Sequence, residues 1–298
     1  MGALWSMLKY LGPVQRQSRP PEPVFSINHI PDLTGRVVIH NAKVYIAARN
    51  QESSETGIGE LKDETGREAL FLELNLASLA SVRKAAETFL TQERELHVLF
   101  NNAGVSQVPI DWLTDDGYDM TFGVNVIGHF LFTQLLLPAL QAGKNTSPDH
   151  HSRIIWLSSF ASYLSTINWD SFKDTPQRRR LGPGSMYYQS KLAAVMLARE
   201  YAKRYGDQGI VALSVNPGNI KTAILRHATK FTLALTLYPV EYGALTQLWA
   251  GTMPEALEHN GEYVVPWARI ADRARPEAYD DQMCARLWDW LEKEVEAK

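Results

Sequence analysis

The chain has 298 residues, a formal net charge of −3 and a hydrophobic content of 45%. This length and hydrophobic content suffice for one large core. The charges are nearly balanced, whereas nucleic-acid-binding domains carry a basic excess, so we predict no nucleic-acid partner. The single cysteine, Cys284, provides neither a disulfide framework nor a cysteine-rich metal cluster. We therefore expect an intracellular, cytoplasmic protein with no metal site.

The N-terminal segment begins with an apolar stretch, Met1 to Leu11, that we expect to form a frayed helix ended by Pro13. The stretch also matches the pattern Met-Gly-x-x-x-Ser, in which Gly2 accepts myristate, so weak membrane association through the N-terminus is an alternative. No apolar run reaches the roughly 20 residues of a membrane span. Residues 12–31 contain five prolines and predict an extended stretch. We therefore divide the chain into an N-terminal arm, residues 1–31, and one domain, residues 32–298.

Apolar runs alternate with amphipathic stretches along the rest of the chain. The predicted strands are residues 70–76, 96–100, 153–157, 210–215 and 263–265. The predicted helices are residues 78–94, 117–142, 185–205, 240–252 and 278–296, the first of them capped by Ser78. This alternation is typical of a doubly wound α/β fold, in which helices cover both faces of a mostly parallel sheet.

The most specific chemical feature is the sequence Tyr187-Tyr-Gln-Ser-Lys191 on a predicted helix. Side chains four residues apart share one helical face, so Tyr187 and Lys191 should lie side by side. A tyrosine with an ordinary pKa of ~10 is a poor acid–base group at neutral pH. Because an adjacent ammonium favours the phenolate, we expect Lys191 to lower the pKa of Tyr187. The pair therefore suits proton transfer to or from an alcohol or carbonyl oxygen.

Polar and glycine-containing sequences lie on either side of this pair. In chain order they are Asn101-Asn-Ala-Gly104, Asn125-Val-Ile-Gly-His-Phe130, Ser158-Ser159 and Asn216-Pro-Gly218. Together with the tyrosine and lysine, this ordered set resembles the short-chain dehydrogenase/reductase family over about residues 32–295. The loop Asp170-Ser-Phe-Lys-Asp174 and the ending Leu287-Trp-Asp-Trp290 resemble its retinol-dehydrogenase-like and protochlorophyllide-reductase-like branch. The resemblance implies a Rossmann-like sheet and hydride transfer to or from a nicotinamide cofactor.

The resemblance also implies a role for each matching residue. Tyr187 would be the acid–base group, and Lys191 would bind the nicotinamide ribose and tune Tyr187. Ser159 would hydrogen-bond the substrate oxygen. Ser158 is the alternative, because adjacent side chains of a strand point in opposite directions. Asn125 would hold a water molecule that links Lys191 to solvent.

A set of cofactor contacts follows from the same resemblance. Arg49 ends a predicted second strand and would bind the 2′-phosphate of NADP, which we prefer to NAD, unless it is simply a solvated arginine. Asn75 stands where the family often has an aspartate that contacts adenine, and its amide would keep one acceptor. The remaining contacts would come from Asn102, Ala103, Gly104, Tyr187, Lys191, Pro217, Gly218 and Thr222.

One part of the family pattern is missing near residues 40–42. Residues 32–39 resemble the first strand with its lead-in and residues 43–49 the second, but only His40, Asn41 and Ala42 lie between them. Parallel neighbours need a crossover of at least ~10 residues. We therefore predict a sheet truncated at its first βαβ unit, without the glycine-rich turn and helix that bind the pyrophosphate. Residues 56–59, Thr-Gly-Ile-Gly, resemble a fragment of that turn, but we interpret them as a loop or helix start.

Residues 37–47 should form either one long strand or a tight antiparallel hairpin through residues 40–42. In both cases the sheet loses a covering helix, which would normally bury several apolar side chains at ~1.5–3 kcal/mol each. That loss is large beside a typical unfolding free energy of ~5–15 kcal/mol. We therefore expect a weakly folded or aggregation-prone chain unless a partner covers the gap.

These features support two main functional hypotheses. The first is an NADP-dependent oxidoreductase acting on a small-molecule alcohol or carbonyl compound, as a monomer or homo-oligomer, with weakened cofactor binding and impaired activity. Residues 219–238 would form an apolar lid and indicate a lipophilic substrate, unless they pack on the core. The second hypothesis is a non-catalytic scaffold or regulatory protein that pairs with a full-length homologue.

Overall fold

The computed structural model of the chain describes residues 9–33, 36, 43–222, 237–271 and 274–297. Several of the interpretations above concern residues outside these ranges. They concern the Gly2 pattern, most of the predicted first strand with the junction after it (residues 34, 35 and 37–42), and residues 223–236 of the predicted lid.

The described strands form two sheets. Their bounds are β1 Tyr45–Ala48, β2 Leu70–Glu73, β3 Val98–Asn101, β4 Ser152–Leu157, β5 Ile210–Val215, β6 Tyr263–Val265 and β7 Arg269–Ile270. β1 and β2 form a separate parallel pair, and β3 to β7 form a five-stranded sheet in that order. All neighbouring pairs are parallel except β6 and β7. The predicted mostly parallel Rossmann-like sheet is confirmed, and it is interrupted between β1 and β3.

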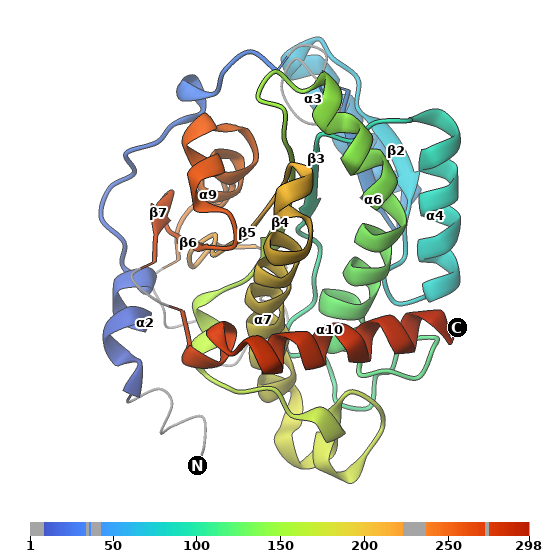
Figure 1. Cartoon of the computed structure of the whole chain (residues 1–298), viewed down its shortest axis with the longest axis vertical. Helices are drawn as coiled ribbons and strands as arrows, with labels where there is room; N and C mark the ends of the chain where they lie inside the picture. Colours follow the sequence, from blue (N-terminus) through green and yellow to red (C-terminus); the bar gives the residue numbers. More distant parts are fainter. Residues whose placement is uncertain (1–8, 34–35, 37–42, 223–236, 272–273, 298) are drawn as a thin grey trace.

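Helices cover both faces of the larger sheet (Figure 1). Their bounds are α2 Leu11–Ser18, α3 Gln51–Thr65, α4 Leu79–Gln92, α5 Met120–Phe122, α6 His129–Thr146, α7 Pro176–Tyr205, α9 Val240–Thr252 and α10 Asp281–Glu296. Ile154 and Trp156 of β4 pack in the core formed with α4, α6, α7 and α10. Ile155 packs on the opposite face with α9. Alternate residues of one strand thus serve two cores, as a doubly wound fold requires.

The long helix predicted over residues 117–142 consists of three consecutive pieces. α5 is followed by a π-helical segment, Gly123–Gly128, and then by α6, which continues beyond Gly143 to Thr146. Gly143 therefore does not end the helix. Its role is in packing, because the absence of a side chain lets α6 approach the backbone of Leu96 closely. Contrary to the sequence prediction, residues 120–146 are long and apolar enough to cross a membrane. However, 78% of their apolar window is buried inside the protein, as in the core helix of a globular domain.

Two further predictions about helix ends are wrong. Pro13 does not end a helix but lies in the first turn of α2. In the first turn the backbone N–H has no partner within the helix, so its absence in proline costs nothing. Ser78 occupies the N-cap of α4, but its side chain makes no capping hydrogen bond. The carboxylate of Asp116 accepts a hydrogen bond from the amide of Leu79 at 2.9 Å instead. Residues 56–59 lie within α3, in line with the helical interpretation.

Candidate active site

Tyr187 and Lys191 lie on α7, after a break in the helix at Gly182, whose φ is 74°. The Nζ atom of Lys191 lies 5.5 Å from the centre of the Tyr187 ring. The same Nζ donates a hydrogen bond of 2.9 Å to the carbonyl of Leu157, the last residue of β4. The helical spacing therefore brings the pair together as predicted, and the end of β4 fixes the lysine.

The electrostatics of the pair differ from the expectation. Burial raises the pKa of Tyr187 to about 12, although a hydrogen bond with the Ser159 side chain acts in the opposite direction. Burial also lowers the pKa of Lys191 to about 8. The prediction that Lys191 gives Tyr187 a low pKa is thus wrong for this structure, because loss of solvation on burial is the largest cause of the shift. Tyr187 is a neutral phenol at pH 7.

The two adjacent serines have different partners. Ser158 is buried, and its Oγ donates a hydrogen bond of 2.7 Å to the backbone carbonyl of Lys191. Ser159 is the N-cap of the 3₁₀ helix Phe160–Tyr163, and its Oγ accepts from the amide of Ala161 at 3.2 Å. Because Ser159 also bonds to Tyr187, we prefer Ser159 for the substrate contact and assign Ser158 to anchoring α7 on β4.

Asn125 lies in the π-helical segment and connects two parts of the site. Its Oδ1 accepts from the amide of Val105 at 2.9 Å, and its Nδ2 donates to the carbonyl of Val105 and to Ser190 Oγ, both at 3.0 Å. Ser190 Oγ in turn donates to the backbone carbonyl of Tyr187 at 2.7 Å. Gly104 is required nearby, since a Cβ there would lie 2.9 Å from Asn125 Oδ1. Asn125 therefore positions the tyrosine-bearing turn, and its water-mediated link to Lys191 stays a prediction.

The predicted cofactor residues follow the carboxyl ends of successive strands. Arg49 is exposed after β1, and after β2 Asn75 Oδ1 accepts from the amide of Ala77 at 3.1 Å. Asn102 and Ala103 are exposed after β3, and Gly104 follows them. Pro217, Gly218 and Thr222 follow β5, and Thr222 is exposed. Gly218 has a φ of 88°, and a Cβ there would lie 2.7 Å from the Trp267 ring, so only glycine fits.

Two buried side chains support the site but had no role in the sequence interpretation. The imidazole of His129 contacts Asn101 Oδ1 at 3.1 Å and the carbonyl of Ala103 at 2.8 Å. Burial lowers the pKa of His129 to about 4, so the ring is neutral at pH 7. Its position four residues after Asn125, on the same helical face, is the signal that could have revealed it.

The second missed residue is Gln17, from the N-terminal arm. Its Oε1 accepts hydrogen bonds from Asn216 Nδ2 at 2.8 Å and from the Tyr263 hydroxyl at 3.1 Å. Asn216 Oδ1 accepts from the amide of Gly218 at 3.0 Å. The arm therefore supports the loop after β5, a contact over almost 200 residues that no local sequence pattern indicates.

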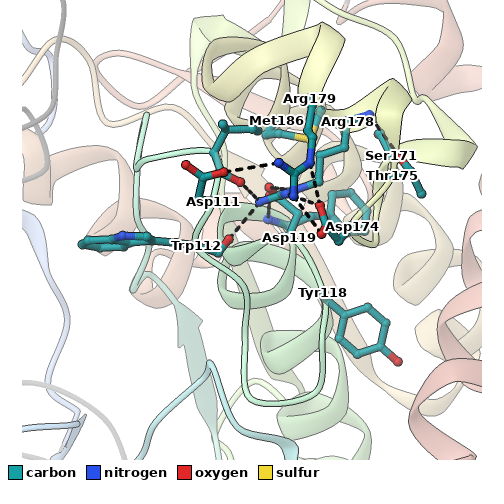
Figure 2. Close-up of polar contacts among 12 residues, drawn as sticks. Asp111, Trp112, Tyr118, Asp119, Ser171, Asp174, Thr175, Arg178, Arg179 and Met186 are labelled. Carbon is teal, nitrogen blue, oxygen red and sulfur yellow. Dashed lines mark hydrogen bonds and ion pairs between the residues drawn. The ribbon is translucent and has the colours of Figure 1, made fainter.

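The first turn of α7 is held by a buried arginine (Figure 2). The guanidinium of Arg178 forms ion pairs with Asp119 at 2.8 Å and with Asp174 at 3.2 Å. It also donates to the backbone carbonyls of Ile110 and Trp112. Arg178 thus ties the loop before α5 to the helix that carries Tyr187.

The described residues fit the two ends of a nicotinamide dinucleotide unequally. At the nicotinamide end, Tyr187 and Gly218 are partly exposed, and the buried Lys191 ammonium beside Tyr187 is held by the carbonyl of Leu157. At the pyrophosphate end, α3 is the helix that follows β1, but its N-cap Asn50 already accepts from the amide of Ser53, and Glu52 lies in its first turn. A carboxylate at that position repels an anion. The nicotinamide end therefore fits and the pyrophosphate end does not.

Comparisons with known proteins agree with this geometry. A sequence model described as short chain dehydrogenase matches residues 32–172. A short-chain dehydrogenase/reductase from Armillaria gallica is 48% identical over 313 residues, covering 98% of both chains. The chain belongs to the short-chain dehydrogenase/reductase family.

Within that family, the chain belongs to the retinol-dehydrogenase-like branch. Retinol dehydrogenase 12 from Homo sapiens is 34% identical over 255 residues, which cover 83% of this chain and 77% of that protein. Among solved structures, an uncharacterized protein from Mycobacterium paratuberculosis aligns with a TM-score of 0.65 and 28% identity, covering 86% of this chain and 85% of that one. The NADPH-bound carbonyl reductase from chicken fatty liver shares the fold, with a TM-score of 0.56, 22% identity and coverage of 76% and 87%.

The Armillaria alignment is longer than this chain. It extends over 313 positions but uses 98% of a chain of 298 residues. That relative therefore has about 20 residues without a counterpart in this chain.

Proposed function

We propose that this chain keeps the proton-transfer half of an NADP-dependent alcohol or carbonyl oxidoreductase but binds the dinucleotide weakly. The observation that carries the proposal is the unequal fit of the two ends of the site. Tyr187, Ser159 and Lys191 are assembled at the end of β4. The residues that should hold the pyrophosphate are not matched in the described part of the chain.

The chain's own residues suit carbonyl reduction. Ser159 and Tyr187 would both hydrogen-bond the substrate oxygen, and the neutral Tyr187 phenol would donate its proton to the developing alkoxide. The Lys191 ammonium, fixed by the carbonyl of Leu157, would stabilise the phenolate that remains. A bound reduced nicotinamide would supply the hydride.

Two finer features of this proposal rest on single observations. Arg49 is exposed at the carboxyl end of β1, and its guanidinium would suit the 2′-phosphate of NADP, which NAD lacks. A lipophilic alcohol or aldehyde is favoured by the apolar composition of residues 219–238 and by the similarity to a retinol dehydrogenase.

Titration of the purified chain with NADPH, followed by nucleotide fluorescence, tests the proposal. We expect a dissociation constant in the millimolar range or weaker. At several millimolar NADPH, reduction of a lipophilic aldehyde should still be detectable by absorbance at 340 nm. Arg49→Ala should bring the NADPH and NADH rates together. Micromolar NADPH binding would show that the pyrophosphate is held after all, and the claim of weakened binding would be wrong.

A scaffold or regulatory protein is the second candidate function. It is favoured by one specific observation, a cavity of about 960 Å³ lined by residues of both β1 and β3. A chain that shows no turnover at saturating NADPH but co-purifies stoichiometrically with a homologue would support it over the first proposal.

A further inference from the structure

Two short segments leave the carboxyl ends of the neighbouring parallel strands β4 and β5. The first, residues 159–163, has Ser159 as the N-cap of a 3₁₀ helix, and we call it the serine turn. The second, residues 216–218, contains Gly218 at a φ of 88°, and we call it the glycine loop. Under the proposed function, the serine turn contacts the substrate oxygen and the glycine loop contacts the nicotinamide. The spacing between the two segments therefore sets how the substrate meets the hydride donor.

One buried side chain of α2 contacts both segments. The Nε2 atom of Gln17 donates to the hydroxyl of Tyr163, the last residue of the serine turn, at 3.3 Å. Its Oε1 accepts from Nδ2 of Asn216, the first residue of the glycine loop, at 2.8 Å. These two bonds span 146 and 199 residues of the sequence, and Gln17 is 5% exposed. A single amide group therefore joins the serine turn to the glycine loop.

Tyr263 of β6 fixes the orientation of this amide. Its hydroxyl donates to Gln17 Oε1 at 3.1 Å. Burial raises the pKa of Tyr263 well above its ordinary value, so the hydroxyl keeps its proton and acts as a donor. Because two donors face Oε1, the carbonyl side of Gln17 must point to Asn216 and Tyr263, and its amino side to Tyr163.

Asn216 passes this orientation on to Gly218. The amino group of Asn216 donates to Gln17, so its Oδ1 faces the other way and accepts from the amide of Gly218 at 3.0 Å. Asn216 is fully buried. Loss of the Gln17 acceptor would therefore leave its amino group without this bond and favour rotation of the side-chain amide. That rotation would take the acceptor away from the Gly218 N–H.

The helix that carries Gln17 is attached to the domain by other contacts as well. Val14 packs in the core, and the carbonyl of Ser18 accepts from Asn219 Nδ2 at 3.5 Å. A substitution at Gln17 should therefore leave α2 in place. A buried polar side chain is costly unless its hydrogen bonds are made, so the amide of Gln17, and not its bulk, is the feature that needs an explanation.

We propose that Gln17 is a positioning residue, which holds the serine turn and the glycine loop at a fixed spacing and so aligns the substrate oxygen with the nicotinamide. The effect on turnover rests on the proposed function, whereas the effect on the glycine loop does not. α2 is thereby part of the active site and not only of an N-terminal arm.

A fluorine signal beside the glycine loop tests the link without cofactor or substrate. The ring of Trp267 lies against Gly218, since a Cβ on that glycine would be 2.7 Å from it. In chain labelled with 5-fluorotryptophan, Gln17→Leu should move the Trp267 resonance by more than its linewidth. The resonance of Trp288, which is buried beneath α10, should stay in place. Single substitutions of the two tryptophans by phenylalanine assign the resonances, and Gln15→Leu, at an exposed position of α2, should move neither.

Gln17→Glu separates the hydrogen bonds from the mere presence of a polar group. Burial favours the neutral form of a carboxyl group, whose carbonyl oxygen accepts and whose hydroxyl donates, as the glutamine amide does. At pH 6 we expect Gln17→Glu to keep the Trp267 resonance of the parent chain. An unchanged resonance in Gln17→Leu, or the same displacement in Gln17→Leu and Gln17→Glu, would overturn the proposal.

Turnover shows whether the spacing matters for the chemistry. At several millimolar NADPH, Gln17→Leu should lower the apparent kcat for a lipophilic aldehyde at least about tenfold and change its KM less than about twofold. Rates are compared per mole of folded protein, measured by circular dichroism. A parent-like kcat in Gln17→Leu would overturn the alignment role. If the parent chain shows no turnover, the proposed function fails, and the Trp267 resonance alone decides whether Gln17 holds the glycine loop.

A second variant covers the case in which Gln17→Leu does not fold. Tyr163→Phe removes the bond from Gln17 to the serine turn and leaves the bond to Asn216 in place. It should lower the apparent kcat without moving the Trp267 resonance. A parent-like kcat in Tyr163→Phe would show that the serine turn does not depend on Gln17 and would overturn the proposal.

Discussion

The two sides of the β1–β3 break differ in how completely their strands are enclosed. β4 and β5 lie between neighbours on both edges and helices on both faces, and every residue of β5 is buried. Among the described strands, β1 pairs with β2 alone, and its four residues are all partly exposed. The proposed catalytic pair, Tyr187 and Lys191, belongs to the enclosed side, whereas Arg49 and Asn75 belong to the open side. Under the proposed function, proton transfer and dinucleotide binding therefore depend on different sides of this break.

The largest effect should come from Tyr187, the proposed acid–base group on the enclosed side. Tyr187→Phe removes the proton donor, so aldehyde reduction at several millimolar NADPH should fall by about 10²–10⁴-fold. Tyr188→Phe is the matched control, because Tyr188 has no lysine four residues later and should retain most of the rate. Equal losses in the two variants, measured by absorbance at 340 nm, would mean that the enclosed side does not perform the proposed chemistry.

Removal of the buried arginine should cost the most stability. Arg178→Met leaves the carboxylate of Asp119 buried and unpaired, so the unfolding free energy should decrease by about 3–5 kcal/mol in urea titrations. Arg179→Met is the control, since the Arg179 side chain is 55% exposed, against 0% for Arg178. The control should change stability by no more than about 0.5 kcal/mol. If Arg178→Met also lowers the unfolding free energy by no more than about 0.5 kcal/mol, the buried ion pair with Asp119 does not hold the start of α7 in place.

The sequence predicted best those elements whose ends are set by turn residues next to them in the chain. β5, β6 and α9 have the predicted limits, because their apolar patterns end at turn residues such as Gly209 and Asn216-Pro-Gly218. The pairing of Tyr187 with Lys191 follows from the helical period alone. The π-helical segment around Asn125 and the raised pKa of Tyr187 could not be predicted, since both depend on packing between distant segments. β7 was missed because two residues carry no periodic signal.

The contact between the N-terminal arm and the enclosed side should have an intermediate effect. Gln17→Leu removes the acceptor shared by Asn216 and Tyr263 in a buried position. We expect the unfolding free energy to fall by about 1–3 kcal/mol. Gln15→Leu, at an exposed position on the same helix, should be nearly neutral. If the two variants lose equal stability, α2 acts through its helical packing and not through the Gln17 hydrogen bonds.

The smallest effect should be a pH dependence that Lys191 gives to the enclosed side. Burial lowers the pKa of Lys191 to about 8 in the folded chain, below its ordinary value of 10.5. Between these two values the unfolded chain binds more protons than the folded one, so the lysine's contribution to stability should increase as the pH rises. The increase is at most about 1.4 kcal/mol per pH unit. The measurement is the difference in unfolding free energy between the parent chain and Lys191→Met, from pH 7 to pH 10, because other titrating groups cancel in that difference. If this difference in unfolding free energy does not change with pH, Lys191 has an ordinary pKa. The enclosed side would then not exclude water from Lys191.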